Sequence, residues 1–124
     1  MRPIPATLWL ALMVAPAAAQ EIHRHGNEVI TGEVGRFYET WRKPDKPNES
    51  CCNRLDCYAT EARFVNDRWQ AKRREDGKWL NIPEQKIERN RDMPDSRAHL
   101  CAPPPNHPHY EKDAVFCFGA GSGS

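Results

Sequence analysis

Five cysteines constrain this chain more than any other sequence feature, because an odd number cannot pair completely within one molecule. Cys51, Cys52 and Cys57 crowd into one short segment, whereas Cys101 and Cys117 lie far downstream. In an oxidising compartment, this spacing predicts an early cysteine cluster that disulfide bonds tie to the end of the fold. The sequence therefore predicts a stapled scaffold in which one sulfur lacks an intramolecular partner.

Geometry narrows the pairing of these cysteines but leaves alternatives. A bond between the adjacent Cys51 and Cys52 would be strained, so we discount it. The favoured layout joins Cys51 or Cys52 to Cys117, and joins Cys57 to Cys101. The unpaired sulfur is then on Cys51 or Cys52. It would be a free thiol, a capped thiol, or half of a bridge to another molecule in a disulfide-linked dimer.

Residues 1–19 have the features of a signal peptide. Arg2 precedes an apolar run centred on residues 8–14, and Ala17–Ala19 supplies the small residues that signal peptidase requires. We expect cleavage before Gln20, because the apolar run is too short to anchor the chain across a bilayer. No later segment is apolar enough to span a membrane, so the predicted localisation is periplasmic or secreted.

The charge balance after cleavage argues against one class of partner. Removing residues 1–19 removes Arg2, one of 18 basic residues, and none of the 17 acidic residues, so the formal net charge becomes zero. Proteins that bind nucleic acids usually carry a basic excess, so we do not expect a nucleic-acid partner. The remaining length suits one domain with a small core that disulfides reinforce.

One helix is predicted near the start of this domain. Val34, Phe37, Tyr38 and Trp41 recur at helical spacing and form an apolar stripe, which we interpret as core. Lys43-Pro44 should end the helix, because the residue before a proline avoids the helical conformation. The predicted organisation is an N-terminal arm, a cysteine-rich domain and a flexible tail, with boundaries at 20–32, 33–118 and 119–124.

Beyond the cysteine cluster the apolar pattern changes to alternation, which is typical of strands. Residues 62–71 predict a hairpin that turns at Asn66-Asp67, and Gly77 predicts a second turn before a strand at 79–82. Further strands are expected at 97–101 and 114–118. The predicted fold class is therefore α+β, with one amphipathic helix packed on a small antiparallel β-meander and stapled by disulfides.

The sequence offers two alternatives for cysteine chemistry, and neither has a strong motif. An unpaired Cys51 or Cys52 beside His99 would form a Cys–His pair in a thiol-active protein or enzyme. Cys52, Cys57, His99 and Cys101 are also suitable ligand types for a structural zinc, but their spacing does not match a zinc motif. We therefore assign no catalytic residue, no metal and no cofactor.

A basic run, Lys72-Arg73-Arg74, is the candidate binding edge. Glu75 and Asp76 follow it directly, so a solvated charged face that protects a strand edge is the simpler interpretation. The alternative interpretation is a contact with an anionic partner, such as a membrane surface or a polysaccharide. No ligand or protein partner can be named from these residues.

Several motifs occur in a fixed order along residues 33–119, and together they resemble the pattern of a known group of proteins. The chain resembles a group of small exported cysteine-rich proteins of unassigned function from alphaproteobacteria and their phages. That resemblance implies that the cysteines belong to one framework, together with the segment Arg97-x-His99-x-Cys101. It brings no activity, cofactor or catalytic residue. The motifs are Phe37-Tyr38-x-x-Trp41, Ser50-Cys51-Cys52-Asn53-x-x-Asp56-Cys57, Trp69, Gly77-x-Trp79, Ile82-Pro83, Pro94-Asp95-x-Arg97-x-His99-x-Cys101 and Phe116-Cys117-Phe118.

These observations favour a small exported protein stabilised by disulfides. The leading hypothesis for its function is non-enzymatic, as a binding protein or an envelope accessory protein of unknown partner. The alternatives are the thiol-active protein and the structural zinc protein described above.

Overall fold

The computed structural model describes residue 3 and residues 22–25, 28–52 and 56–122, with the side chains of 22–31 left out. Apart from residue 3, the predicted signal peptide lies outside the described residues. The elements in chain order are β1 (Ile22–His25), β2 (Glu28–Thr31), α1 (Gly32–Thr40), β3 (Arg42–Lys43), β4 (Lys46–Ser50), β5 (Cys57–Thr60), β6 (Ala62–Val65), β7 (Arg68–Lys72), β8 (Trp79–Asn81), the 3-10 turn η1 (Glu84–Lys86), β9 (Ala98–Cys101) and β10 (Cys117–Gly119).

The predicted fold class, α+β with one helix packed on a single meander, is wrong. The chain is β-rich: its described strands form two three-stranded and two two-stranded antiparallel sheets, beside one short helix. Two strands lie where the sequence lacks alternation. β4 crosses a polar segment that contains Pro47, and the first half of β5 is buried on both faces. A strand that is buried on both faces loses the alternating pattern that makes strands visible in a sequence.

The helix α1 is shorter than the apolar stripe predicted. It ends at Thr40, whose hydroxyl donates back to the carbonyls of Arg36 and Phe37. The chain then leaves the helix because Arg42 pairs with Ser50 across the hairpin of β3 and β4. Trp41 lies just beyond the helix and is fully buried. The interpretation of the stripe as core is confirmed, since its aromatic residues pack together in one cluster.

The two three-stranded sheets are joined into an incomplete barrel. One has the order β10-β9-β5 and the other β6-β7-β8, and β5 runs almost directly into β6. Where the strands meet, Lys72 N–H donates to the Glu61 carbonyl and the Thr60 hydroxyl donates to the Lys72 carbonyl. On the opposite side, Ile87 forms a parallel bridge with Phe118. The two sheets thus enclose a shared apolar interior, with a single bridge rather than a strand pairing on that side in the described residues.

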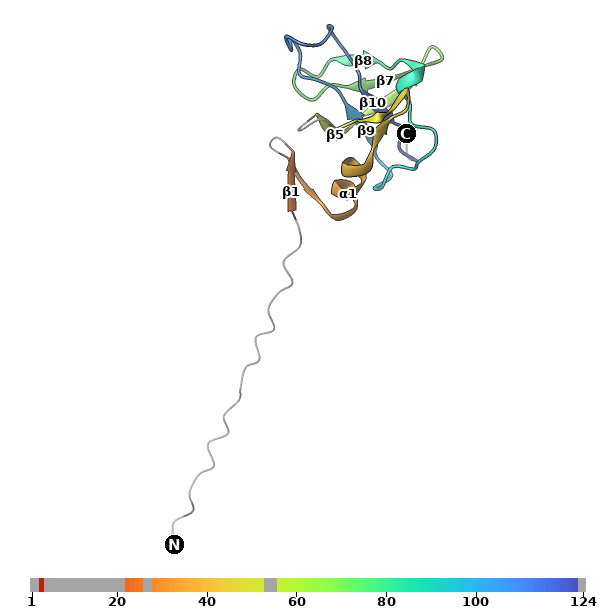
Figure 1. The fold of residues 1–124 in the computed structure, drawn as a ribbon. Helices are drawn as coiled ribbons and strands as arrows, with labels where there is room; N and C mark the ends of the chain where they lie inside the picture. Colours follow the sequence, from red (N-terminus) through yellow and green to blue (C-terminus); the bar gives the residue numbers. More distant parts are fainter. Residues whose placement is uncertain (1–2, 4–21, 26–27, 53–55, 123–124) are drawn as a thin grey trace.

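The β10-β9-β5 sheet is buried on both faces. Successive side chains in a strand point to opposite faces, so neighbouring residues of β9 belong to different cores. Leu100 and Phe118 pack with Tyr58 and Leu80 inside the barrel. Cys101 and the residues opposite it on the adjacent strands, Cys57 and Cys117, pack instead with the aromatic residues of α1. Figure 1 shows this arrangement, with α1 on one side of β5, β9 and β10 and with β7 and β8 on the other.

The turn chemistry that the sequence predicted is present. Asn66 and Asp67 have φ values of 54° and 59° between β6 and β7, as a tight hairpin turn with two left-handed residues requires. Gly77 has a φ of 71° at the second predicted turn. The residues after Pro83 form the 3-10 turn η1. These local predictions are confirmed.

The first residues of the predicted tail pack against the rest of the domain. Gly119 belongs to β10, and a Cβ atom there would meet the side chain of Met93. At Gly121, a Cβ atom would collide with the backbone of Ser96 and Arg97. Two residues of the predicted tail therefore lie against the body of the domain, and at Gly121 the contact is with backbone, which cannot shift as the end of the Met93 side chain can.

Among the residues that the structure describes, no helix is long and apolar enough to cross a membrane.

Candidate functional site

Cys51 and Cys117 form a disulfide bond that is separate from the other three cysteines. Their Cα atoms are 5.6 Å apart, and the bond ties the residue after β4 to β10. The backbone N–H of Cys51 also donates to the Trp41 carbonyl at 2.9 Å. Disulfide bonding is thus confirmed, and the bond between Cys51 and Cys117 is one of the two that the favoured layout allowed. Such bonds are consistent with an extracellular or otherwise oxidising compartment.

The other three cysteines form one cluster, which we call the sulfur triad: Cys52, Cys57 and Cys101. Their sulfur atoms all lie within 4.8 Å of one another. Cys57 lies at bonding distance from both of the others, and Cys52 Sγ is 3.7 Å from Cys101 Sγ. A cysteine sulfur forms one disulfide bond at a time, so the triad holds one bond and one unbonded sulfur. The expectation that Cys51 could be the unpaired cysteine is therefore corrected.

Burial separates the members of the triad. Cys57 and Cys101 are fully buried, whereas Cys52 is only partly buried. Asp56 lies beside the triad and its carbonyl accepts a hydrogen bond from Ala102 N–H at 3.0 Å. Burial raises the pKa of the Asp56 carboxyl above its usual value.

His99 is committed to partners other than the triad. Its side chain is fully buried, and Nδ1 lies 2.5 Å from the Tyr38 hydroxyl. Nε2 donates to Asp95 at 2.6 Å, because a carboxylate can only accept. Burial raises the pKa of Asp95, but the hydrogen bond and charge of His99 outweigh it, so the pKa of Asp95 is lowered. Both ring nitrogens are thus engaged away from the cysteines.

This arrangement changes both cysteine alternatives. In the thiol-active alternative, the sulfur that reacts would lie in the triad, and His99 would not be its base. In the zinc alternative, the described residues bring three sulfurs together, and the group contains no histidine. The four-ligand set that includes His99 is not assembled, since its two nitrogens bond to Tyr38 and Asp95.

The basic run Lys72-Arg73-Arg74 does not present three free cations. Arg73 is only 3% exposed, and its guanidinium bonds to Asp76 at 2.7 and 3.0 Å and to Asp113 at 3.0 Å. These hydrogen bonds raise the pKa of Arg73 above its already high value, with Asp76 as the largest cause.

The two cations beside Arg73 lie over aromatic rings. Arg74 lies 4.4 Å from the centroid of the Tyr58 ring, and Lys72 lies 5.6 Å from that of Trp79. Lys72 also pairs with Glu61 at 3.6 Å. This edge therefore braces the barrel, and each of its three positive charges is already engaged.

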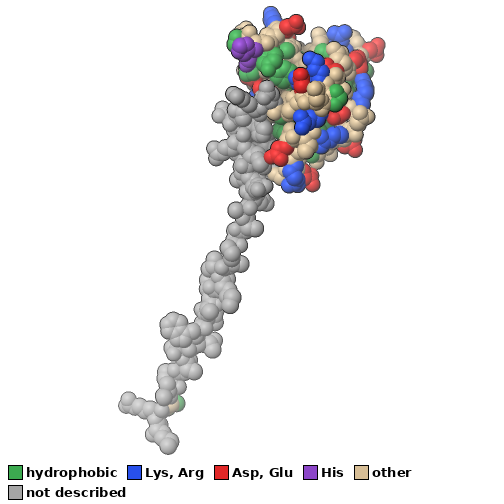
Figure 2. Space-filling view, viewed as in Figure 1, with side chains coloured by type: hydrophobic (Ala, Val, Ile, Leu, Met, Phe, Trp, Pro, Cys, Tyr) green, Lys and Arg blue, Asp and Glu red, His purple; other side chains and the backbone are tan. Residues whose placement is uncertain are grey.

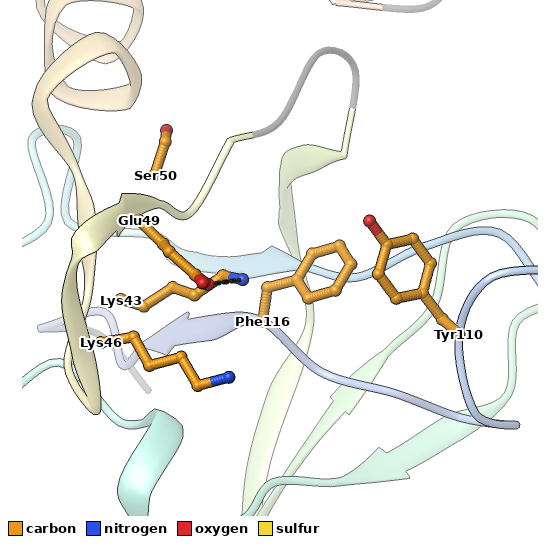
Figure 3. A pocket seen from close by; sticks show the side chains of 6 residues that line it. All are labelled: Lys43, Lys46, Glu49, Ser50, Tyr110 and Phe116. Carbon is orange, nitrogen blue, oxygen red and sulfur yellow. Dashed lines mark hydrogen bonds and ion pairs between the residues drawn. The ribbon is translucent and has the colours of Figure 1, made fainter.

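A different surface combines lysines with two aromatic rings, of which Tyr110 is exposed and Phe116 is buried. A hollow of about 550 Å³ lies between the β3–β4 hairpin and the segment before β10. Figure 3 shows Lys43, Lys46 and Glu49 facing Tyr110 and Phe116 across it. A second hollow of about 520 Å³ adjoins it and is lined by the same two lysines and two aromatic rings, with His109 and Lys112 among its further lining residues. We call the two hollows together the Tyr110 groove.

Charge and exposure differ among the residues of the Tyr110 groove. Lys43 Nζ pairs with Glu49 at 2.8 Å and lies 5.0 Å from the centroid of the Phe116 ring. The hydrogen bond from Lys43 lowers the pKa of Glu49. Lys46 acts on Glu49 only through its charge, and its amine points into the hollow in Figure 3. Tyr110 is 40% exposed, and its ring meets that of Phe116 edge to face at 4.8 Å.

Sequence reasoning missed this groove. Lys43 lies where the helix was predicted to end, Lys46 follows in a polar segment with no predicted element, and Tyr110 follows several prolines far along the chain. One local signal was present, because Tyr110 follows His107 and His109, and the His107 ring contacts both of the other rings. The meeting of this loop with the β3–β4 hairpin depends on tertiary structure.

Other exposed groups are scattered. Phe64 is 58% exposed and Val65 41% exposed at the tip of the β6–β7 hairpin. On the face drawn in Figure 2, basic and acidic side chains are interspersed. Scattered apolar groups of this kind are common on protein surfaces and carry no site by themselves.

Comparisons with protein-family models, with curated proteins and with solved structures found no match to this chain. Its function therefore has to be argued from its own geometry.

Proposed function

We propose that this is an exported, non-enzymatic binding protein, periplasmic or secreted, that holds an acidic carbohydrate chain in the Tyr110 groove. The observation that carries the proposal is the pairing of an exposed tyrosine ring with a lysine amine across one hollow. Export is supported by the signal-like residues 1–19 and by the disulfide bonds. The resemblance to small exported cysteine-rich proteins agrees with this location.

The shape of the groove favours an elongated ligand. The two adjoining hollows share Lys43, Lys46, Tyr110 and Phe116, so one chain could run through both. Each hollow has about the volume that a small ligand fills. A flat membrane surface would not enter such a concave site, whereas a polymer segment a few units long would.

The chemistry of the groove favours a sugar with an acidic group. The flat face of a sugar ring carries C–H groups and can pack on an aromatic ring such as Tyr110, which is amphipathic. A carboxylate on that sugar would meet Lys46, because the amine of Lys43 is already paired with Glu49. Lys112, which is exposed at the second hollow, offers a further positive charge to a longer chain.

The same contacts argue for binding rather than catalysis. Lys43 and Glu49 neutralise each other, and the lowered pKa of Glu49 keeps that carboxyl ionised near neutral pH. A general acid needs a pKa near the working pH, so Glu49 is unsuited to that role.

The test is a titration of the isotope-labelled mature protein, followed by amide NMR shifts. We expect oligogalacturonate to shift the amides around Lys46 and Tyr110, and an uncharged oligosaccharide of equal length to shift them far less. Lys46→Glu and Tyr110→Ala should each weaken binding at least about tenfold. The control is Arg68→Glu, a charge reversal at an exposed position on β7, which should leave the affinity unchanged.

Two results would overturn the proposal. One is the absence of localised shifts with every acidic oligosaccharide tried. The other is binding that Lys46→Glu and Arg68→Glu weaken equally, because that would reflect net charge alone. Tighter binding of an acidic peptide in the same groove would replace the carbohydrate with a peptide ligand.

A further inference from the structure

The sulfur triad, which is separate from the Tyr110 groove, contains more sulfur atoms than one disulfide bond can use. Three sulfurs share a space in which only one disulfide bond can exist at a time. Cys57 is placed to bond with either Cys52 or Cys101, and those two sulfurs approach to 3.7 Å. Whichever bond forms, the remaining sulfur lies beside it.

We propose that Cys52, Cys57 and Cys101 form a thiol–disulfide exchange site, in which one disulfide moves about Cys57 and the exposed state reacts with low-molecular-weight disulfides. The internal step is balanced without any other reactant. The Cys101 thiolate attacks Cys57 of the Cys52–Cys57 bond, a Cys57–Cys101 bond forms, and Cys52 leaves as the thiolate. The reverse step returns the thiolate to Cys101.

The two states differ in what solvent can reach. When Cys57 is bonded to Cys52, the unbonded sulfur is on Cys101, which is fully buried. When Cys57 is bonded to Cys101, the unbonded sulfur is on Cys52, which is partly exposed. The internal step therefore moves one thiol between a covered and an accessible position, while the number of disulfide bonds stays constant.

The fold holds the members of this site in place. Cys57 and Cys101 are directly opposite each other on β5 and β9. Cys51 is anchored by its own disulfide and by the Trp41 carbonyl, so the adjacent Cys52 cannot move far from the strand pair. The backbone N–H of Cys52 also donates a hydrogen bond to the Ser50 hydroxyl at 3.2 Å, which further restricts the position of Cys52.

The external step consumes a disulfide of the type RS–SR. The Cys52 thiolate attacks one sulfur of RS–SR, a Cys52–SR bond forms, and RS⁻ leaves, so charge and atoms balance. The products are a capped protein and one equivalent of the small thiol. Attack by RS⁻ on the capped cysteine reverses the step.

The first experiment maps the bonds of the purified wild-type mature protein. Acid stops exchange, and digestion by pepsin at low pH then shows which cysteines are linked. We expect both Cys52–Cys57 and Cys57–Cys101 links, with Cys51–Cys117 in every molecule. Brief treatment of the native protein with iodoacetamide should then modify Cys52 alone and leave all molecules with the Cys57–Cys101 bond.

Two single variants separate a shared bond from a merely unpaired cysteine. In Cys101→Ser, the proposal expects Cys52 and Cys57 to bond, so that no thiol reacts. If Cys52 cannot reach Cys57, the same variant has two free thiols, and the partly exposed Cys52 reacts in the folded protein. The matched control Cys52→Ser keeps the Cys57–Cys101 bond and should also show none.

The last measurement adds glutathione disulfide to each protein. We expect one glutathione adduct on Cys52 of the wild type, its reversal by reduced glutathione, and none on either variant. Wild-type protein that contains only the Cys57–Cys101 link would overturn the proposal, as would any reactive thiol in folded Cys101→Ser. Because the wild-type bond map needs no variant, the proposal remains testable even if Cys101→Ser fails to fold.

Discussion

The two faces of the β10-β9-β5 sheet are stabilised in different ways. On the barrel side, ordinary apolar side chains such as Leu80 and Phe118 fill the space between two sheets. On the other side, a helix of nine residues and the β3–β4 hairpin cover the sheet, and every cysteine of the chain lies there. A short helix cannot hold itself in place, since most helical stability comes from packing. The comparison shows covalent bonds used where the covering layer is too small.

The largest effect should come from removing the bond that ties down this covering layer. We expect Cys51→Ala with Cys117→Ala to lower the free energy of unfolding by about 4 kcal/mol, because the bond closes a loop with a sequence separation of 66. Urea unfolding without reductant measures this change. Hydrogen exchange should show the greatest loss of protection in residues 41–50. Equal loss throughout β7 and β8 would contradict the division between the two faces.

A cavity in the barrel should be the next largest effect. Leu80 is 1% exposed, so Leu80→Ala should cost about 3 kcal/mol through lost contacts and the cavity that remains. Chemical denaturation would measure this cost. The loss should be of similar size with the Cys51–Cys117 bond present or absent, if the two faces contribute independently. A strong interaction between the changes would show that the faces act as one core.

A smaller effect is expected at the buried ion pairs that Arg73 forms with Asp76 and Asp113. Arg73→Met should cost about 2 kcal/mol, because it removes hydrogen bonds from a buried guanidinium to Asp76 and Asp113. Lys78→Met is the matched control, since Lys78 also pairs with Asp113 but is 46% exposed and should cost less than about 1 kcal/mol. Thermal melts of both variants would compare them. Equal costs would mean that the burial of Arg73 adds nothing.

The weakest effect should appear only in acid. The hydrogen bond from Arg73 lowers the pKa of Asp76 to about 2, below its unfolded value of about 3.9. The native state therefore binds fewer protons here than the unfolded state, and this contribution to stability is present above pH 4 and lost as the pH falls towards 2. We expect Arg73→Met to flatten the stability curve in that interval. An unchanged acid limb would assign the acid sensitivity to other carboxylates.

The local structure followed from the sequence better than the architecture did. The turns at Asn66-Asp67 and Gly77 need left-handed backbone, which leaves a clear signature. β5 left none, because the alternation of Cys57 and Tyr58 separates two buried cores rather than inside from outside. The stripe ending in Trp41 identified core residues but not the end of the helix, which depends on strand pairing.

The candidate sites were predicted only in part, because they bring together residues that lie far apart in the sequence. The count of five cysteines required an unpaired sulfur, but only the fold shows that Cys52, Cys57 and Cys101 share it. Arg73 looked like a surface cation because its acceptor Asp113 lies 40 residues away. The Tyr110 groove joins segments whose separate sequences give no reason to expect contact.

The single cysteine of β9 also links the register of that strand to disulfide formation. Cys101 faces Cys57 on one neighbouring strand and Cys117 on the other. A slip of β9 by one residue would turn Cys101 into the barrel and place an aliphatic residue among the cysteines. Oxidation would then fail to join β5 to β9. The Cys57–Cys101 bond can thus form only in molecules whose β5 and β9 are correctly aligned, so oxidative folding selects the correct strand pairing.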